Sequence, residues 1–83
     1  MEFVLTNLEK YNKAFMTALT IEVSQLGKDL LYNSVASWDS IGHMTLIAAL
    51  EDEFDILMEM EDILEFDSYE NGLKLVAKYE VKF

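Results

Sequence analysis

Residues 38–56 read WDSIGHMTLIAALEDEFDI, and this stretch decides the fold. Asp39 and Ser40 precede a strongly periodic apolar run that ends near Phe54 and Asp55. Either of the first two side chains could accept hydrogen bonds from the unpaired N–H groups of a first helical turn. We therefore predict a helix that begins at this pair and ends near Phe54.

An amphipathic stripe and a long loop come before this helix. The residues of the stripe recur at spacings of three and four, which predicts a helix over about residues 2–19. Residues 20–38 have no sustained helical period, yet they carry apolar side chains among Gly, Ser and Asn, so we predict a long loop pinned to the core. The stripe consists of Val4, Leu8, Tyr11, Phe15 and Leu19, and the apolar loop residues are Ile21, Val23, Leu26, Leu30, Leu31, Tyr32, Val35 and Trp38.

Two further helices are predicted after residue 56. Residues 59–66 are long enough for only one or two turns, and Ser68 is the predicted N-cap of a last helix. The stripe of that helix consists of Tyr69, Leu73, Val76 and Tyr79. The expected fold is a single all-α domain over residues 1–83, a small four-helix bundle with three main helices, one short third helix and a long first loop.

The composition agrees with a helical domain and limits its partners. The 83 residues are 52% hydrophobic and include no Pro and three Gly. A formal net charge of −10 would repel nucleic acid and anionic membranes, so we expect neither as a partner and expect a basic protein surface instead. The absence of Cys and the single His exclude the usual zinc sites, and we expect no metal site. Met1-Glu2-Phe3 lacks the basic start and apolar run of a signal peptide, so we expect a cytoplasmic protein. We also expect it to be a monomer.

The central helix has two apolar faces when its residues are placed at intervals of about 100°. One face carries Leu46, Ile47, Leu50 and Phe54, and the opposite face carries Ile41, Met44 and Ala48 together with Glu51, Asp52 and Asp55. The first face suits a bundle core. We interpret the second as a partner-binding surface with an apolar centre and an acidic rim, because no remaining segment is available to cover it.

Residues 38–44 (WDSIGHM) and 50–56 (LEDEFDI) together resemble acyl and peptidyl carrier proteins. Those proteins carry an Asp-Ser-Leu-like motif at the start of their second helix, followed by an acidic run that ends in Phe and a short apolar stretch. The resemblance extends through residues 62–68 to Tyr79 and covers most of the chain. It implies that Ser40, within the cofactor-binding pair Asp39-Ser40, receives phosphopantetheine from coenzyme A, and that the thiol of this arm holds an acyl cargo as a thioester.

The resemblance also implies a set of partners and a non-catalytic role. The partners would be a phosphopantetheinyl transferase, a cargo-loading ligase or acyltransferase, and downstream synthase enzymes with basic docking surfaces.

The sequence departs from the carrier pattern at four positions. Ile41 stands in place of the commoner Leu, Gly42 and Thr45 stand where carriers of fatty acid synthesis usually have acids, and Glu59 stands where many relatives have Pro. These departures favour a free-standing carrier of a specialised biosynthetic pathway.

Three alternatives to the carrier role are an enzyme, a calcium-binding loop and an unmodified interaction module. As a catalytic set, Ser40, His43 and Asp39 would lack a nucleophile turn and an oxyanion hole. The helical wheel also places His43 on the inward side of the helix. We therefore predict that this imidazole is structural. A calcium loop starting at Asp67 would need oxygen ligands at its third and twelfth positions, which are Tyr69 and Lys78. The main alternative is an acidic helical protein-interaction module that is never modified.

For Trp38 we predict packing against the body of the domain.

Overall fold

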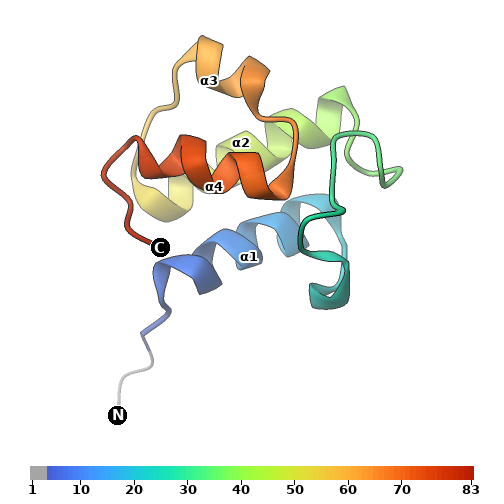
Figure 1. The fold of residues 1–83 in the computed structure, drawn as a ribbon, viewed down its shortest axis with the longest axis horizontal. Helices are drawn as coiled ribbons and strands as arrows, with labels where there is room; N and C mark the ends of the chain where they lie inside the picture. Colours follow the sequence, from blue (N-terminus) through green and yellow to red (C-terminus); the bar gives the residue numbers. More distant parts are fainter. Residues whose placement is uncertain (1–3) are drawn as a thin grey trace.

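The computed structural model describes residues 4–83, and over this range the chain folds as a small bundle of four α-helices (Figure 1). In chain order they are α1 (Asn7–Leu19), α2 (Ser40–Phe54), α3 (Met60–Glu65) and α4 (Tyr69–Ala77), with one turn of 3₁₀-helix at Val23–Gln25 in the first loop. This confirms the predicted all-α bundle with three main helices, a short third helix and a long first loop.

The three main helices surround the core, and α3 lies at one edge of it. Figure 1 shows α4 in front of α2, with α1 below them and α3 above them. The most extensive contact between two helices is that of α1 with α2. Asn7 Nδ2 donates to the carbonyl oxygen of Lys82 at 2.9 Å, so the end of the chain lies against the start of α1. Within residues 4–83, no helix has the length and apolar character needed to cross a bilayer.

The start of α1 differs from the prediction. The helix begins at Asn7 instead of about residue 2, and residues 2 and 3 lie outside the described part of the chain. Thr6 Oγ1 accepts the N–H of Glu9 at 3.1 Å, and Glu9 Oε1 accepts the N–H of Thr6 at 2.9 Å. This reciprocal capping box stops the helix at Thr6 and leaves Val4 exposed in front of it. The prediction is wrong because the apolar spacing extends back to Val4, which precedes the Thr-x-x-Glu cap that starts the helix.

Aromatic side chains form the centre of the core. Tyr11 and Phe15 of α1 are fully buried, and the Tyr11 hydroxyl donates to the carbonyl oxygen of Tyr69 at 2.7 Å. Burial raises the pKa of the Tyr11 hydroxyl. The Phe15 ring lies edge-on to that of Trp38, with the two ring centroids 5.5 Å apart, an arrangement that aromatic pairs prefer. It is tilted relative to the ring of Phe66, with the centroids 6.1 Å apart. The largest fully buried side chains are Trp38, Tyr11, Phe15, Phe66, Leu19, Leu46, Ile47, Leu50 and Val76.

The long first loop is attached to the core at two points. Leu30 and Trp38 are buried, as expected of a loop pinned to the body of the domain. Two backbone hydrogen bonds of 2.9 Å, from Tyr69 N to Leu30 O and from Tyr32 N to Asp67 O, join the loop to the start of α4. The side chains of Val23, Leu31 and Tyr32 stay exposed, so only part of the apolar content of the loop enters the core.

The third and fourth helices lie close to their predicted positions. The predicted segment of residues 59–66 contains α3, which spans Met60–Glu65. Ser68 is the N-cap of α4, because its Oγ accepts the N–H of Asn71 at 2.9 Å. Tyr79 lies in the turn just after the end of α4.

A buried carboxylate ties α3 to the end of α4. Asp62 is 4% exposed; its Oδ1 accepts from Lys78 Nζ at 2.6 Å and its Oδ2 accepts from the Tyr79 hydroxyl at 2.5 Å. The Tyr79 oxygen in turn accepts the N–H of Glu59 at 2.9 Å. The Lys78 hydrogen bond, followed by that of Tyr79, lowers the pKa of Asp62. Sequence reasoning missed this cluster, because Asp62 looks like one more acid of an acidic segment.

Candidate functional site

Ser40 is the first residue of α2 and its side chain is exposed. The helix is capped by the preceding residue, since Asp39 Oδ1 accepts the N–H of Gly42 at 2.8 Å. The sequence left open which of the two side chains would cap the helix. Because Asp39 performs this role, the helix terminus does not require the Ser40 hydroxyl.

Gly42 allows the first loop to pack directly against the first turn of α2. A Cβ atom at this position would lie only 1.8 Å from the carbonyl oxygen of Ser37, a distance that no side chain can occupy. Gly42 stands where carriers of fatty acid synthesis usually have an acid, and the structure gives a steric reason for the glycine. A glycine inside a helical period was the available signal, because such a residue usually has a packing reason.

Trp38 and His43 form the inner support of this helix start. Trp38 is fully buried, and its Nε1–H donates to His43 Nδ1 at 3.0 Å. The second imidazole nitrogen, His43 Nε2, lies 2.8 Å from the carbonyl oxygen of Ile63 in α3. The structure thus places Trp38 against the body of the domain and His43 on the inward side of α2, as predicted. The two ring nitrogens of His43 thus contact the first loop, through Trp38, and α3, through Ile63.

An apolar groove opens beside Ser40, between α2 and α3. Its volume is about 360 Å³. Met60 and Leu64 are 66% and 76% exposed although both are apolar, so α3 presents apolar surface at this edge of the molecule. Sequence reasoning missed the contribution of α3, because the helical period shows its apolar residues but not which element lies opposite. The groove is lined by Tyr32, Ser40, His43, Met44, Met60, Ile63, Leu64, Phe66 and Asp67.

The predicted partner surface lies on the outer face of α2. Ile41 and Met44 are 77% and 53% exposed, and Ala48 is exposed as well. On the opposite face Leu46, Ile47 and Leu50 are buried. The helical wheel therefore assigned both faces correctly, and the outer face is open among the described residues.

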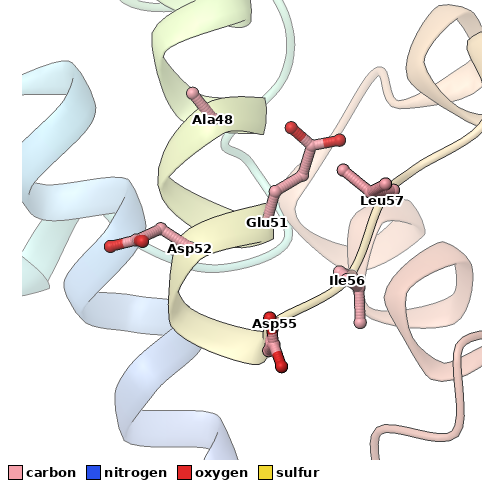
Figure 2. A pocket seen from close by; sticks show the side chains of 6 residues that line it. All are labelled: Ala48, Glu51, Asp52, Asp55, Ile56 and Leu57. Atoms are coloured by element: carbon pink, nitrogen blue, oxygen red, sulfur yellow. The ribbon is translucent and has the colours of Figure 1, made fainter.

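A shallow hollow of about 690 Å³ continues this face at the end of α2 (Figure 2). Figure 2 shows Glu51 pointing toward Leu57 and Asp52 pointing away from both. Glu51 Oε2 accepts the N–H of Met58 at 2.9 Å, so this acid holds the connection between α2 and α3 as well as facing the hollow. Leu57, which sequence reasoning did not select, is 85% exposed. The hollow is lined by Ala48, Glu51, Asp52, Asp55, Ile56 and Leu57.

The predicted site residues therefore fall into two groups. Ser40 and Met44 line the groove, and Asp39 and Ile41 stand on either side of Ser40 at the start of α2. Ala48 and the three acids line the hollow toward the other end of α2. Within residues 4–83, no group of three His, Cys, Asp or Glu side chains is arranged to hold a metal ion. Comparison of the chain with protein-family models, with curated proteins and with solved structures gave no significant match.

Proposed function

We propose that this protein is an acyl carrier protein, which holds its cargo as a thioester on a phosphopantetheine arm attached to Ser40. The observation that carries the proposal is the position of Ser40. It is an exposed hydroxyl at the first residue of a helix that another side chain caps, and an apolar groove opens beside it. A hydroxyl that bears a long flexible arm needs this exposure.

The start of α2 suits the phosphodiester that such an arm contains. Asp39 engages the N–H of Gly42, which leaves the N–H groups of Ser40 and Ile41 in the first turn without intrahelical acceptors. These groups and the positive end of the helix dipole favour an anion bonded to the Ser40 oxygen. The resemblance of residues 38–44 and 50–56 to carrier proteins points to the same chemistry at this serine.

The groove beside Ser40 supports an apolar cargo. Met44 of α2 and Met60 and Leu64 of α3 flank it, and methionine side chains adapt to ligands of different shape. An acyl chain returned to this groove would leave water for an apolar surface, at about 25 cal/mol for each Å² buried. A charged aminoacyl group would gain little there.

The neighbourhood of Ser40 does not favour a hydrolase. A nucleophilic serine needs a base that accepts its proton, and His43 is the single histidine of the sequence. Both His43 ring nitrogens are engaged, one by Trp38 and the other by Ile63. The imidazole therefore contributes to the fold in this geometry.

The decisive experiment is covalent modification. The full chain is incubated with coenzyme A, magnesium and a broad-specificity phosphopantetheinyl transferase, and its intact mass is measured. We expect the mass of one phosphopantetheine group to be added, and we expect none on Ser40→Ala at unchanged helical content. A wild-type chain that stays unmodified, or a modified Ser40→Ala variant, contradicts the proposal. The first result would favour the unmodified acidic interaction module.

The outer face of α2 is the proposed docking surface for the enzymes that load and use the cargo. Ile41, Met44 and Ala48 would form its apolar centre, with Glu51, Asp52 and Asp55 as its charged rim. Exposed charges at a rim mainly steer association, and their effect weakens as salt screens them.

A double charge reversal tests this surface. Asp52→Lys with Asp55→Lys should slow modification of Ser40 by a transferase with a basic docking surface by about tenfold at low salt, and should flatten the salt dependence. Glu22→Lys with Asp29→Lys, which reverses two exposed acids of the first loop, is the control with the same change in net charge. Equal rates for the double variant and the control would place docking elsewhere.

A further inference from the structure

The inner side of the groove beside Ser40 is closed by aromatic rings. Phe66, which directly follows α3, lines the groove although only 1% of the residue is exposed, so most of its ring lies inside the bundle. The His43 ring also lines the groove and lies edge-on to that of Phe66, with the two centroids 6.0 Å apart. Trp38 is fully buried, and its ring centroid lies 6.3 Å from that of Phe66. The groove therefore has a floor of packed rings.

The backbone of α4 holds the Phe66 ring in place. A Cβ atom at Gly72 would overlap this ring and would lie only 2.6 Å from Phe66 Cε1, so the ring occupies space that a glycine alone leaves free on α4. On another side the Phe15 ring is tilted against it, with the centroids 6.1 Å apart. A ring packed on several sides leaves a void if it turns away, which is costly in a close-packed interior. The floor is therefore rigid.

The outer side of the groove has the opposite character. Met60 and Leu64 of α3 are mostly exposed, and Met44 of α2 is exposed as well. Methionine side chains are flexible and adapt to the shape of a ligand. An apolar chain that starts at Ser40 would therefore meet an adaptable outer wall and a rigid inner floor.

The size of the groove limits how much of a chain it can cover. A cavity of about 150 Å³ holds one benzene ring, so a volume of about 360 Å³ has room for the carbon of about two such rings, or about a dozen atoms. Further carbon atoms of a longer chain would stay in water and gain nothing from burial.

We propose that Phe66 is the specificity-determining residue of the groove: its ring bars an acyl chain from the core, so the site shelters chains of up to about a dozen carbon atoms and holds longer chains no better. The inference rests on the proposed function, because it assigns a class of cargo to the arm on Ser40. The closed floor itself can be tested without that arm.

A single thiol at position 40 provides the test. The sequence has no cysteine, and Asp39 caps α2, so Ser40→Cys places one thiol at the groove without removing the cap. Alkyl methanethiosulfonates then attach butyl, octyl, dodecyl or hexadecyl groups: the thiolate forms a disulfide with the alkylthio group, and methanesulfinate leaves. Intact mass verifies each adduct of the full chain.

Two measurements report where the chain lies. The thermal midpoint of unfolding should rise from the butyl to the dodecyl adduct, and the hexadecyl adduct should agree with the dodecyl adduct within about 1 °C. Isotope-filtered nuclear Overhauser effects from the alkyl chain should reach the methyl groups of Met44 and Met60. They should not reach the Hα protons of Gly72, which lie behind the Phe66 ring.

Phe66→Ala in the Ser40→Cys chain removes the floor. The alkyl chain should then contact Gly72, and the hexadecyl adduct should melt at least about 4 °C above the dodecyl adduct because more methylene groups are buried. Phe66→Leu is a smaller truncation that should give the same new contact if the alanine variant does not fold. Phe54→Ala is the matched control, because Phe54 is a partly buried ring near the other end of α2 that does not line the groove. It should keep the original limit.

Three results would overturn the role of Phe66. They are contact between the alkyl chain and Gly72 while Phe66 is present, a hexadecyl adduct clearly more stable than the dodecyl adduct in that same chain, and no new contact in either Phe66 variant. The first two need no Phe66 variant to fold. Failure of Ser40 to accept phosphopantetheine is a separate observation made by mass on the wild-type chain, so it leaves these measurements unaffected.

Discussion

The two faces of α2 carry similar apolar side chains and lie in opposite environments. Leu46 and Leu50 on the inner face are fully buried, whereas Ile41 and Met44 on the outer face are mostly exposed. The inner face packs against α1, and the outer face borders the groove and the hollow. The hydropathy of a residue therefore does not determine its burial in this domain. What determines it is the element that lies opposite.

The largest expected effect on stability is that of replacing Trp38, which is fully buried next to the start of α2. Trp38→Ala should lower the free energy of unfolding by about 4 kcal/mol, because it empties a fully buried site beside Phe15 and leaves His43 Nδ1 without its donor. Urea unfolding followed by circular dichroism measures this loss. A loss within about 0.5 kcal/mol, as for a surface residue, would contradict the packing described.

Leu46→Ala tests the inner face itself. Its side chain is completely buried, so the truncation should cost about 3 kcal/mol through lost burial and a residual cavity. The midpoint of urea unfolding should fall while the slope of the transition stays the same. A variant as stable as the wild type would show that the two faces of α2 do not differ as their burial indicates.

The boundary between loop and helix is expected to contribute less. Asp39→Ala removes the acceptor of the Gly42 N–H and should cost about 1 kcal/mol. Asp39→Asn retains a capping oxygen and is the matched control, which should lose much less stability. If both substitutions cost the same, the charge of Asp39 matters more than its cap.

The smallest effect is expected on the outer face. Ile41→Ala and Met44→Ala should each change stability by no more than about 0.5 kcal/mol, because both side chains are already exposed to water. The same two variants should slow transfer by a docking enzyme if this face is the partner surface. A loss of stability comparable to that of Leu46→Ala would mean that another element covers the face.

Much of the fold could be predicted from local pattern. The period of residues 40–54, the short segment near residue 60 and the cap at Ser68 depend on neighbours along the chain, and each lies where the sequence placed it. The start of α1 differs from the prediction although its signal is also local, because the apolar spacing extends to Val4 and the capping pair of Thr6 and Glu9 starts the helix later.

The contacts at the site could not be predicted in the same way. The bond of His43 to Ile63, the link of Asp62 to Lys78 and the approach of Ser37 to Gly42 each need two segments brought together by the fold. A helical wheel can turn His43 inward, but it cannot say which carbonyl oxygen will be there. Leu57 was missed for the same reason, since its exposure depends on the path of the connection between α2 and α3.

The sequence by itself determined the helical class, the approximate helix positions, the two faces of α2 and the serine at its start. These features follow from period, capping and charge, which act over a few neighbouring residues. Only the tertiary structure decided that Asp39 caps the helix, that the groove lies between α2 and α3, and that the His43 imidazole joins Trp38 to Ile63. The physical reason is that donors, acceptors and steric limits act over a few ångströms in space, whatever the separation of the residues along the chain.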